Sequence, residues 1–247
     1  MIELYDDETL TRVNENLELI QKKHGLTFGT DAYLLYAYMK MQKSSIAVDF
    51  GCGTGIISLL CASKGKFKKI YAVDVQEEFC NVAKRNAEGN SLNNIIEVVC
   101  SDVRDFKTEA DIVFTNPPYM RSDSGRSNES IAKNIARHEI FGGISDFVGA
   151  ASRILKYGGT FYCVYRPDRL CDLICAMREK AIEPKRMTFV HATMAHEPSM
   201  VLIEGKKGAK PSVTVTKPLI LNDRKGETED IKFIYERGEF GEQFCKR

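Results

Sequence analysis

Short hydrophobic runs alternate along most of this chain with longer segments whose apolar residues recur every three or four positions. Such runs predict buried strands, and apolar residues at helical spacing predict helices packed on them. The predicted strands are Ile46–Phe50, Ile70–Val73, Ile95–Val99, Ile112–Phe114 and Thr160–Tyr165. The predicted helices are Ile56–Ser63, Glu77–Glu88, Ile144–Leu155 (stopped by Gly158-Gly159) and Leu170–Lys180. This alternation is typical of an α/β fold with helices on both faces of a parallel sheet.

The pattern changes toward the C-terminus, where Met187–Ala192 and Met200–Glu204 are two predicted strands with no helix between them. The intervening Thr193–Ser199 is too short for the crossover that joins parallel strands. One of the two strands is therefore expected to run antiparallel. The sequence thus predicts a Rossmann-like three-layer sandwich with a mostly parallel seven-stranded sheet and one antiparallel strand near the C-terminus.

The chain is expected to divide into three segments. Residues 1–45, with a helical pattern at Asp31–Met41, are expected to form an N-terminal extension that packs on the main fold. Residues 46–205 form the main α/β domain. Residues 206–247 carry mixed signals and glycine breaks, so we expect a ragged surface extension of the same domain.

Composition narrows the class of protein. Hydrophobic residues make up 43% of the 247 positions, charged residues make up 28%, and 35 basic residues nearly balance 34 acidic ones. This is ordinary for a soluble globular protein and unlike a protein that coats nucleic acid. No apolar run approaches the ~20 residues of a membrane span, and the acidic N-terminus lacks the features of an export signal. We therefore expect a cytoplasmic protein whose eight cysteines are reduced.

Basic clusters and histidines are weaker candidates for binding. Solvated surface is the usual role of such clusters, and phosphate contact is the alternative. The clusters are Lys64, Lys66, Lys68 and Lys69, then Lys185-Arg186, then Lys206, Lys207 and Lys210. His191 and His196 are too far apart for a one-turn helical metal pair, and no Cys-x-x-Cys pair occurs, so no metal site is expected.

A glycine-rich loop follows the first predicted strand of the main domain. In an open α/β sheet, ligands bind at the carboxyl ends of the strands, which is where Asp49-Phe50-Gly51-Cys52-Gly53-Thr54-Gly55 lies. Its glycines, Gly51, Gly53 and Gly55, allow a tight turn and close approach of the backbone to a ligand. The spacing differs from the dinucleotide fingerprint, and a plain tight turn is the alternative.

Three acidic residues lie at or just beyond the ends of successive predicted strands: Asp49, Asp74 and Asp102. A carboxylate at the second strand can accept both hydroxyl groups of a ribose. Each aspartate alone could be a helix cap or a turn residue. Together they suit a ligand that carries a ribose, an adenine and an ammonium group, and no P-loop lysine is present for a nucleotide phosphate.

Asn116-Pro117-Pro118-Tyr119 follows the fourth predicted strand. An amino group on an aromatic ring or a carbonyl is a poor nucleophile because its lone pair is delocalised. The Asn116 side-chain oxygen and the Pro117 carbonyl can accept its two hydrogens and favour tetrahedral nitrogen. Tyr119 offers a flat face for stacking. A rigid turn with a packed tyrosine is the alternative.

Together the glycine loop, the three acids and the Asn-Pro-Pro-Tyr sequence resemble class I S-adenosylmethionine-dependent methyltransferases over residues 28–204. The resemblance implies that residues 46–205 are the methyltransferase domain and that S-adenosylmethionine is the cofactor. It implies that Asp49 lies near the methionine end, Asp74 holds the ribose and Asp102 contacts the adenine. The implied cofactor-binding set is Thr30, Asp49, Gly51, Gly53, Gly55, Asp74, Val75, Asp102, Val103 and Asn116, and the implied catalytic set is Asn116, Pro117 and Tyr119.

Further segments narrow the acceptor. Phe28-Gly29-Thr30-Asp31, Ala136–Glu139, Val190-His191, Met200–Gly208 and Lys217–Ile220 resemble the bacterial tRNA adenine-N6 methyltransferases that modify A37 beside the anticodon of a valine tRNA. In such enzymes a threonine like Thr30 caps a helix that faces the cofactor carboxylate. The resemblance implies methyl transfer to the N6 amino group of an adenine in a tRNA anticodon loop, with the anticodon stem-loop as partner and no membrane or metal. A monomer is favoured, although the sequence does not fix the oligomeric state.

Other interpretations stay open. The Asn-Pro-Pro-Tyr sequence also occurs in methyltransferases of guanine amino groups and of release-factor glutamine amides, although the ~45 residues before Ile46 leave little room for the N-terminal helical domain usual in the glutamine enzymes. A non-catalytic S-adenosylmethionine-binding partner of an RNA enzyme is a further alternative that would not need that sequence. Met120–Asn134, with Arg121 and Arg126, is either a lid over the acceptor or a surface loop.

Overall fold

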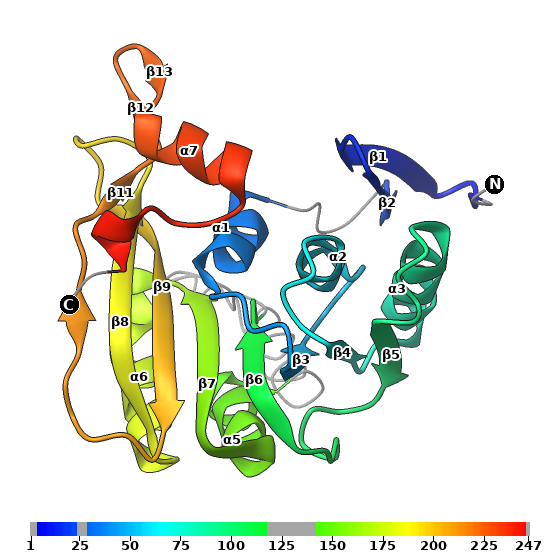
Figure 1. Cartoon of the computed structure of the whole chain (residues 1–247), viewed down its shortest axis with the longest axis horizontal. Helices are drawn as coiled ribbons and strands as arrows, with labels where there is room; N and C mark the ends of the chain where they lie inside the picture. The colour runs from blue at the N-terminus through cyan, green and yellow to red at the C-terminus, as the bar shows by residue number, and fades with distance from the viewer. Residues whose placement is uncertain (1–3, 24–28, 118–141, 246–247) are drawn as a thin grey trace, which may run out of the picture.

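The computed structural model describes residues 4–23, 29–117 and 142–245. A nine-stranded sheet forms the centre of the molecule, with its principal strands in the order β8-β9-β7-β6-β3-β4-β5 from left to right in Figure 1. These strands are β3 (Ile46–Phe50), β4 (Lys69–Asp74), β5 (Ile96–Cys100), β6 (Ala110–Thr115), β7 (Leu155–Tyr165), β8 (Ile182–His191) and β9 (Pro198–Lys207).

The sheet is parallel except at one strand. β3, β4, β5, β6 and β7 pair in parallel, whereas β9 lies between β7 and β8 and is antiparallel to both. The predicted arrangement of seven strands, with one antiparallel strand near the C-terminus, is confirmed. Two short strands that the sequence did not predict, β10 (Thr214–Val215) and β11 (Leu219–Ile220), pair in parallel with β8.

Helices cover both faces of the sheet and give the three predicted layers (Figure 1). One core lies between the sheet and α1 (Thr30–Tyr38), α2 (Ile56–Ser63), α3 (Glu77–Gly89) and α7 (Glu229–Arg237). The other lies between the opposite face and α5 (Ile144–Ile154) and α6 (Leu170–Glu179), and the 3-10 turn η1 (Pro167–Arg169) precedes α6. Within the described residues, no helix has the length and apolarity needed to cross a membrane.

An unpredicted N-terminal hairpin packs on this fold. Its strands, β1 (Glu8–Asn14) and β2 (Leu17–Lys22), pair antiparallel, and β2 contacts α3. The buried Asn86 side chain of α3 accepts from the Ile20 backbone N–H at 2.7 Å and donates to the Ile20 carbonyl at 3.1 Å and to the Thr54 carbonyl at 2.9 Å. One amide therefore joins the hairpin to the glycine loop.

The predicted stop of α5 at Gly158-Gly159 is wrong. The helix ends at Ile154, and β7 begins at once at Leu155 and runs through both glycines. A Cβ on Gly159 would lie 2.9 Å from the Lys156 carbonyl oxygen and 3.0 Å from that of Asp111. These glycines therefore let two strands approach closely at an irregularity in the β6–β7 register.

The expectation of a ragged C-terminal surface segment is also wrong. Besides β10, β11 and α7, this segment contains β12 (Asn222–Asp223), β13 (Gly226–Glu227) and the 3-10 turn η2 (Glu242–Phe244). Its buried residues join the core on the α1 face of the sheet: Leu219, Ile231, Ile234, Phe240 and Phe244. The pattern was missed because these apolar residues are spread over elements of two to nine residues, too short for a clear period.

Two residues of the predicted basic surface clusters are in fact buried. Lys66 Nζ donates to the Tyr36 and Met39 carbonyls at 2.8 and 2.6 Å, and its burial lowers its pKa to about 8. Arg186 forms a 2.8 Å ion pair with Glu204, donates to the Tyr38 carbonyl at 2.8 Å and stacks on the Tyr38 ring. Both cations lie at the C-terminal end of α1, where carbonyl groups are left without helical partners. They fix the far end of a helix whose first turn faces the site described next.

Candidate active site

The carboxyl ends of four parallel strands meet at one edge of the sheet. Phe50, the last residue of β3, is paired with Val73 of β4 and with Thr115 of β6, and Asp74 is paired with Cys100 of β5. The loops that leave these strands carry the glycines, Asp74, Asp102 and Asn116. The register therefore brings together at one edge the motifs that the sequence singled out.

The glycine loop has a backbone that requires glycine. Gly51, Gly53 and Gly55 have φ values of +70°, +53° and +86°, in the left-handed region. The N–H groups of Gly51 and Cys52 both donate to the Val73 carbonyl, at 2.8 and 3.1 Å, which ties the loop to β4. Gly55 is the N-cap of α2 and provides no side-chain cap, so the first N–H groups of this helix are available at the loop. A Cβ on Gly53 would meet nothing within 4 Å, so the loop is open there.

Asp49 is buried beneath this loop, with 1% of its surface exposed. Its Oδ2 accepts from the Ser58 hydroxyl at 2.7 Å, whereas its buried Oδ1 has no hydrogen-bond partner within the described part of the chain. Burial raises the pKa of Asp49 to about 7, and nearby Asp74 adds to the shift. Sequence reasoning missed Ser58, a buried polar residue in a mostly apolar helix.

Asp74, the last residue of β4, is also buried. Its Oδ2 accepts from the Gly53 N–H and its Oδ1 from the Gln76 N–H, both at 2.9 Å. The carboxylate therefore orients the glycine loop, and the Gln76 side chain and the Val75 N–H also bond to it. Burial raises the pKa of Asp74. Val75 follows with 38% of its surface exposed, which is high for an apolar residue and leaves a face for a flat ligand.

Asp102 lies two residues beyond β5 and is paired with Arg104. The Arg104 Nη2 lies 2.6 Å from Asp102 Oδ2, its Nε is 3.0 Å from both carboxylate oxygens, and its backbone N–H also donates to Oδ1. These bonds hold the pKa of Asp102 below its ordinary value. Sequence reasoning did not anticipate Arg104. The Val103 side chain is buried in the core on the α5 face.

The helix cap expected at Thr30 lies one residue earlier in the chain. α1 begins at Thr30, and the N-cap is Gly29, which makes no side-chain cap bond. Thr30 is therefore the first residue of the helix, and its N–H is among the groups without a helical partner.

Asn116 is the residue that connects this helix with the end of β6. Its Nδ2 donates to Asp31 Oδ2 at 2.9 Å, and its buried Oδ1 has no hydrogen-bond partner among the residues that the structure describes. The preceding Thr115 hydroxyl donates to the Phe50 carbonyl at 2.8 Å and holds β6 against the start of the glycine loop. Pro117 is buried. Sequence reasoning missed the contact with Asp31.

Several predicted residues lie outside the described part of the chain. They are Phe28, Pro118, Tyr119, Met120–Asn134 with Arg121 and Arg126, and Ala136–Glu139.

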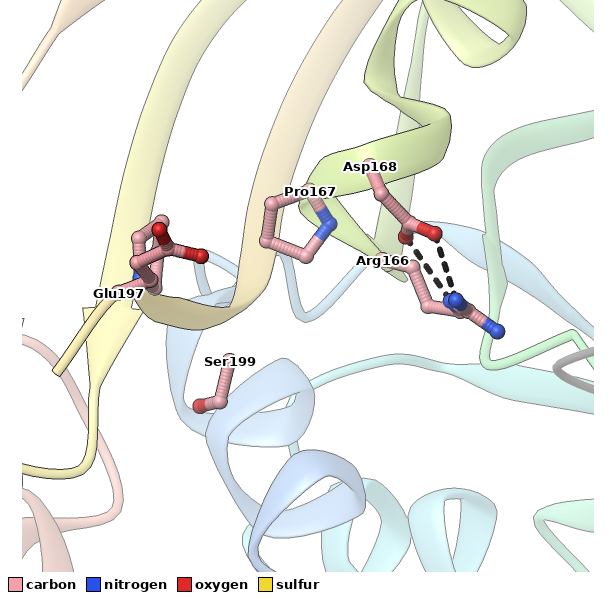
Figure 2. A pocket seen from close by; sticks show the side chains of 6 residues that line it. Arg166, Pro167, Asp168, Glu197 and Ser199 are labelled. Atoms are coloured by element: carbon pink, nitrogen blue, oxygen red, sulfur yellow. Dashed lines mark hydrogen bonds and ion pairs between the residues drawn. The ribbon is translucent and has the colours of Figure 1, made fainter. Parts of the chain in front are cut away.

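A polar pocket lies at the same edge of the sheet, beyond Asn116. Arg166 directly follows β7, and Pro198 begins the neighbouring antiparallel strand β9, so both lie at the carboxyl edge. The pocket has a volume of ≈ 390 Å³, and Figure 2 shows Arg166 and Asp168 pointing toward each other on one side of it and Glu197 on the other. Its lining residues are Arg166, Pro167, Asp168, Glu197, Pro198 and Ser199.

The third predicted basic cluster is not at this edge. Lys206 is paired with Thr160, near the start of β7, so the cluster lies at the opposite end of the strands. Lys207 Nζ donates to the Ser152 and Leu155 carbonyls at the end of α5, which is a structural role. No cluster of three metal-ligating side chains occurs in residues 4–23, 29–117 and 142–245.

Comparison with known proteins agrees with this geometry. Residues 23–174 match the methyltransferase small domain family. A tRNA1(Val) (adenine(37)-N6)-methyltransferase from Phocaeicola vulgatus is 30% identical over 180 residues, which cover 72% of this chain and 76% of the relative. A protein of the same name from Dyadobacter fermentans is 26% identical, over 83% of this chain and 85% of the relative. The crystal structure of a predicted O-methyltransferase from Agrobacterium tumefaciens shares the fold, with a TM-score of 0.69 and 20% identity over 86% of this chain and 98% of that chain.

Proposed function

The chain belongs to the methyltransferase small domain family, and from this premise we propose that it transfers a methyl group from S-adenosylmethionine to the N6 amino group of adenine 37 in a tRNA anticodon loop. Family membership confirms the sequence-based prediction of a methyltransferase. The assignment of an amino group as the acceptor rests on Asn116. Its buried Oδ1 has no partner in the described residues and lies at the end of β6 near the glycine loop.

The residues at the glycine loop fit S-adenosylmethionine. The buried Asp49 Oδ1 has no partner within the described residues, and a carboxylate there matches an ammonium group. Asp74 presents a carboxylate to ribose hydroxyls at the end of β4, and the exposed Val75 offers an apolar face for adenine. Asp102 lies beyond the next strand, within the same edge. When bound, S-adenosylmethionine supplies an activated methyl group on a positively charged sulfur.

On this proposal, Asn116 and Pro117 act on the acceptor. The Asn116 Oδ1 accepts one hydrogen of the N6 amino group, and the Pro117 carbonyl accepts the other. Two acceptors in this arrangement draw the nitrogen toward tetrahedral geometry and free its lone pair from the ring. Because the donor methyl group is already activated, positioning supplies most of the rate and no strong base is needed. Tyr119 is proposed to stack on the flipped base.

The comparisons support a tRNA acceptor over the alternatives. The relatives from Phocaeicola vulgatus and Dyadobacter fermentans are named as tRNA adenine-37 enzymes and align with most of this chain.

The test is methyl transfer from labelled S-adenosylmethionine to an unmodified tRNA1(Val) transcript, followed by mass spectrometry of the nucleosides. We expect N6-methyladenosine with the wild-type transcript and none when adenine 37 is replaced by guanine. A purified release factor serves as the competing acceptor. Label on the release factor glutamine and none on the tRNA would overturn the RNA assignment and support the glutamine alternative. Cofactor binding with label on neither would support the non-catalytic alternative.

A further inference from the structure

We propose that Asp31 is a positioning residue that holds the Asn116 side chain with its oxygen turned toward the acceptor amino group. The inference rests on the proposed function and deepens it. It starts from one contact, the 2.9 Å hydrogen bond from Asn116 Nδ2 to Asp31 Oδ2, which joins the first turn of α1 to the end of β6.

The chemistry of the two groups fixes the orientation of the amide. An ionised carboxylate only accepts hydrogen bonds, whereas an asparagine amide has a donor side and an acceptor side. Asp31 therefore selects the rotamer in which Nδ2 faces it and Oδ1 faces away. The opposite rotamer would set oxygen against oxygen at Asp31 and would present an NH₂ group to an acceptor that is itself an NH₂ group. The buried Oδ1, which has no partner in the described residues, is the atom that this selection leaves for the substrate.

The same bond makes the oxygen a better acceptor. Hydrogen bonds in series polarise one another, and a bond to a charged group is stronger than one between neutral groups. Donation from Nδ2 to a carboxylate shifts electron density in the amide toward Oδ1. That oxygen faces an amino nitrogen that gains positive charge as the new bond forms, so the effect is larger in the transition state than in the ground state.

Asp31 is held in place from both sides. Lys66 and Arg186 fix the far end of α1 through the Tyr36, Tyr38 and Met39 carbonyls. At the near end the carboxylate is packed over Gly29, because a Cβ on that residue would lie 2.7 Å from Asp31 Oδ1. Gly29 has φ −118° and ψ 177°, which any residue adopts, so the reason for glycine here is space for the carboxylate.

A simpler role for Asp31 is favourable charge at a helix N-terminus, which has a small effect on stability at the surface. That role predicts a small change in melting temperature and no coupling to Asn116. Glu229 is the matched control, since it is an acid in the first turn of α7 on a different part of the molecule.

The test is a double-mutant cycle on kcat with tRNA1(Val) transcript. Asp31→Ala is expected to lower kcat about 10- to 100-fold, within the roughly 2- to 150-fold range of coupling between residues in contact, with KM for tRNA and Kd for S-adenosylmethionine changed less than threefold. In the Asn116→Ala background the same substitution should change kcat less than twofold. Asp31→Asn, which keeps an oxygen for Nδ2, should lie between wild type and Asp31→Ala. Gly29→Ala, which displaces the carboxylate and keeps its charge, should also lower kcat, and Glu229→Ala should leave kcat unchanged.

An activity-independent readout separates this inference from the proposed function. In protein labelled with ¹⁵N-asparagine, the Asn116 side-chain signals are assigned from their loss in Asn116→Ala. Asp31→Ala should shift them and speed their exchange with solvent, while the melting temperature stays within a few degrees. Equal additive losses in both backgrounds, or an unchanged Asn116 signal, would overturn the role of Asp31. If Asp31→Ala shifts the Asn116 signals but the wild-type enzyme methylates no tRNA, the proposed function is overturned instead.

Discussion

Two regions of this molecule that bury polar groups differ in whether those groups have partners. At the C-terminal end of α1, Lys66 and Arg186 are buried with a Glu204 carboxylate and main-chain carbonyls as partners. At the carboxyl edge of the sheet, Asp49 and Asn116 each bury an oxygen that has no partner in the described residues. A buried polar atom without a partner costs free energy in the ligand-free protein. The first region is therefore scaffold, and the second is arranged for a ligand that completes it.

The largest effect is expected in the scaffold region. Arg186→Ala removes the buried cation of the Glu204 ion pair and leaves Glu204 only the more exposed Lys40 at 3.6 Å. Breaking a buried pair typically destabilises a protein by ~3–5 kcal/mol. Denaturant unfolding monitored by circular dichroism measures it. The double variant Arg186→Met with Glu204→Leu removes both charges and should recover a large part of the loss. A denaturant unfolding curve of Arg186→Ala that overlays that of the wild type would show that this region does not stabilise the fold.

Asn116→Ala should have the largest effect among changes in the ligand region. It should lower the rate of methyl transfer and leave the stability of the fold nearly unchanged. Loss of one well-placed polar contact in a closed site costs ~10²–10³ in kcat. Unfolding free energy and S-adenosylmethionine affinity should stay near wild type, because the contact acts on the acceptor. Single-turnover assays on unmodified tRNA transcript give the rate. Substantial turnover by this variant would sink the mechanism proposed for Asn116.

Asp74→Ala should weaken S-adenosylmethionine binding at least tenfold. Hydrogen bonds to a charged group are worth ~1.5–3 kcal/mol, and this carboxylate also holds the Gly53 N–H of the loop. Calorimetry of cofactor binding measures the loss. Arg104→Ala is the control at the neighbouring strand end, since it leaves the Asp102 carboxylate in place. Wild-type affinity in Asp74→Ala would remove Asp74 from the cofactor site.

Asp49→Asn should stabilise the cofactor-free protein and weaken S-adenosylmethionine binding. Burial raises the pKa of folded Asp49 to about 7, above the ~3.9 of an unfolded aspartate. The unfolded state therefore loses its proton first as pH rises, and the stability associated with Asp49 falls between about pH 4 and 7. Without cofactor, the variant should melt a few degrees higher than wild type at pH 8 and show little advantage at pH 4.

The same variant should bind S-adenosylmethionine more weakly at pH 8, because the amide cannot pair with the ammonium group as a carboxylate does. Differential scanning fluorimetry and calorimetry across this pH range provide both values. A wild type that melts higher than the variant at pH 8 in the absence of cofactor would contradict the assignment of Asp49 to the ligand region.

The smallest effects concern surface charge at the two ends of the strands. Lys206 and Lys210 lie at the edge away from Asn116. The double variant Lys206→Gln with Lys210→Gln should therefore leave the salt dependence of tRNA binding unchanged. Arg166→Gln, in the pocket at the same edge as Asn116, should reduce the slope of log K against log salt by about one phosphate contact. Filter binding at several salt concentrations compares them. A reduced slope for the lysine pair alone would place the tRNA at the opposite edge.

The parts of the fold and site that follow local patterns could be predicted from sequence. The strands at Ile46, Ile70 and Ile112, the glycine loop and the acids at strand ends all depend on residues that are neighbours in the chain. The contact between Asp31 and Asn116 joins positions that only the fold brings together, and a single sequence carries no signal for it beyond an acid next to Thr30. The burial of Lys66 was missed for the same reason, since its carbonyl partners belong to a distant helix.

The strand pairing at β8 has a consequence for how copies of this protein behave toward one another. β8 is ten residues long and, without residues 214–220, would border the sheet with a row of unpaired N–H and C=O groups, the kind of surface on which other chains add strands. β10 and β11 pair with Arg186, Met187, Val190 and His191 and cover that row. Pro218 between them and Pro211 before them lack N–H donors and offer little to a further strand. The C-terminal segment thus protects the sheet against edge-to-edge self-association, and loss of β10 and β11 would expose an aggregation-prone border.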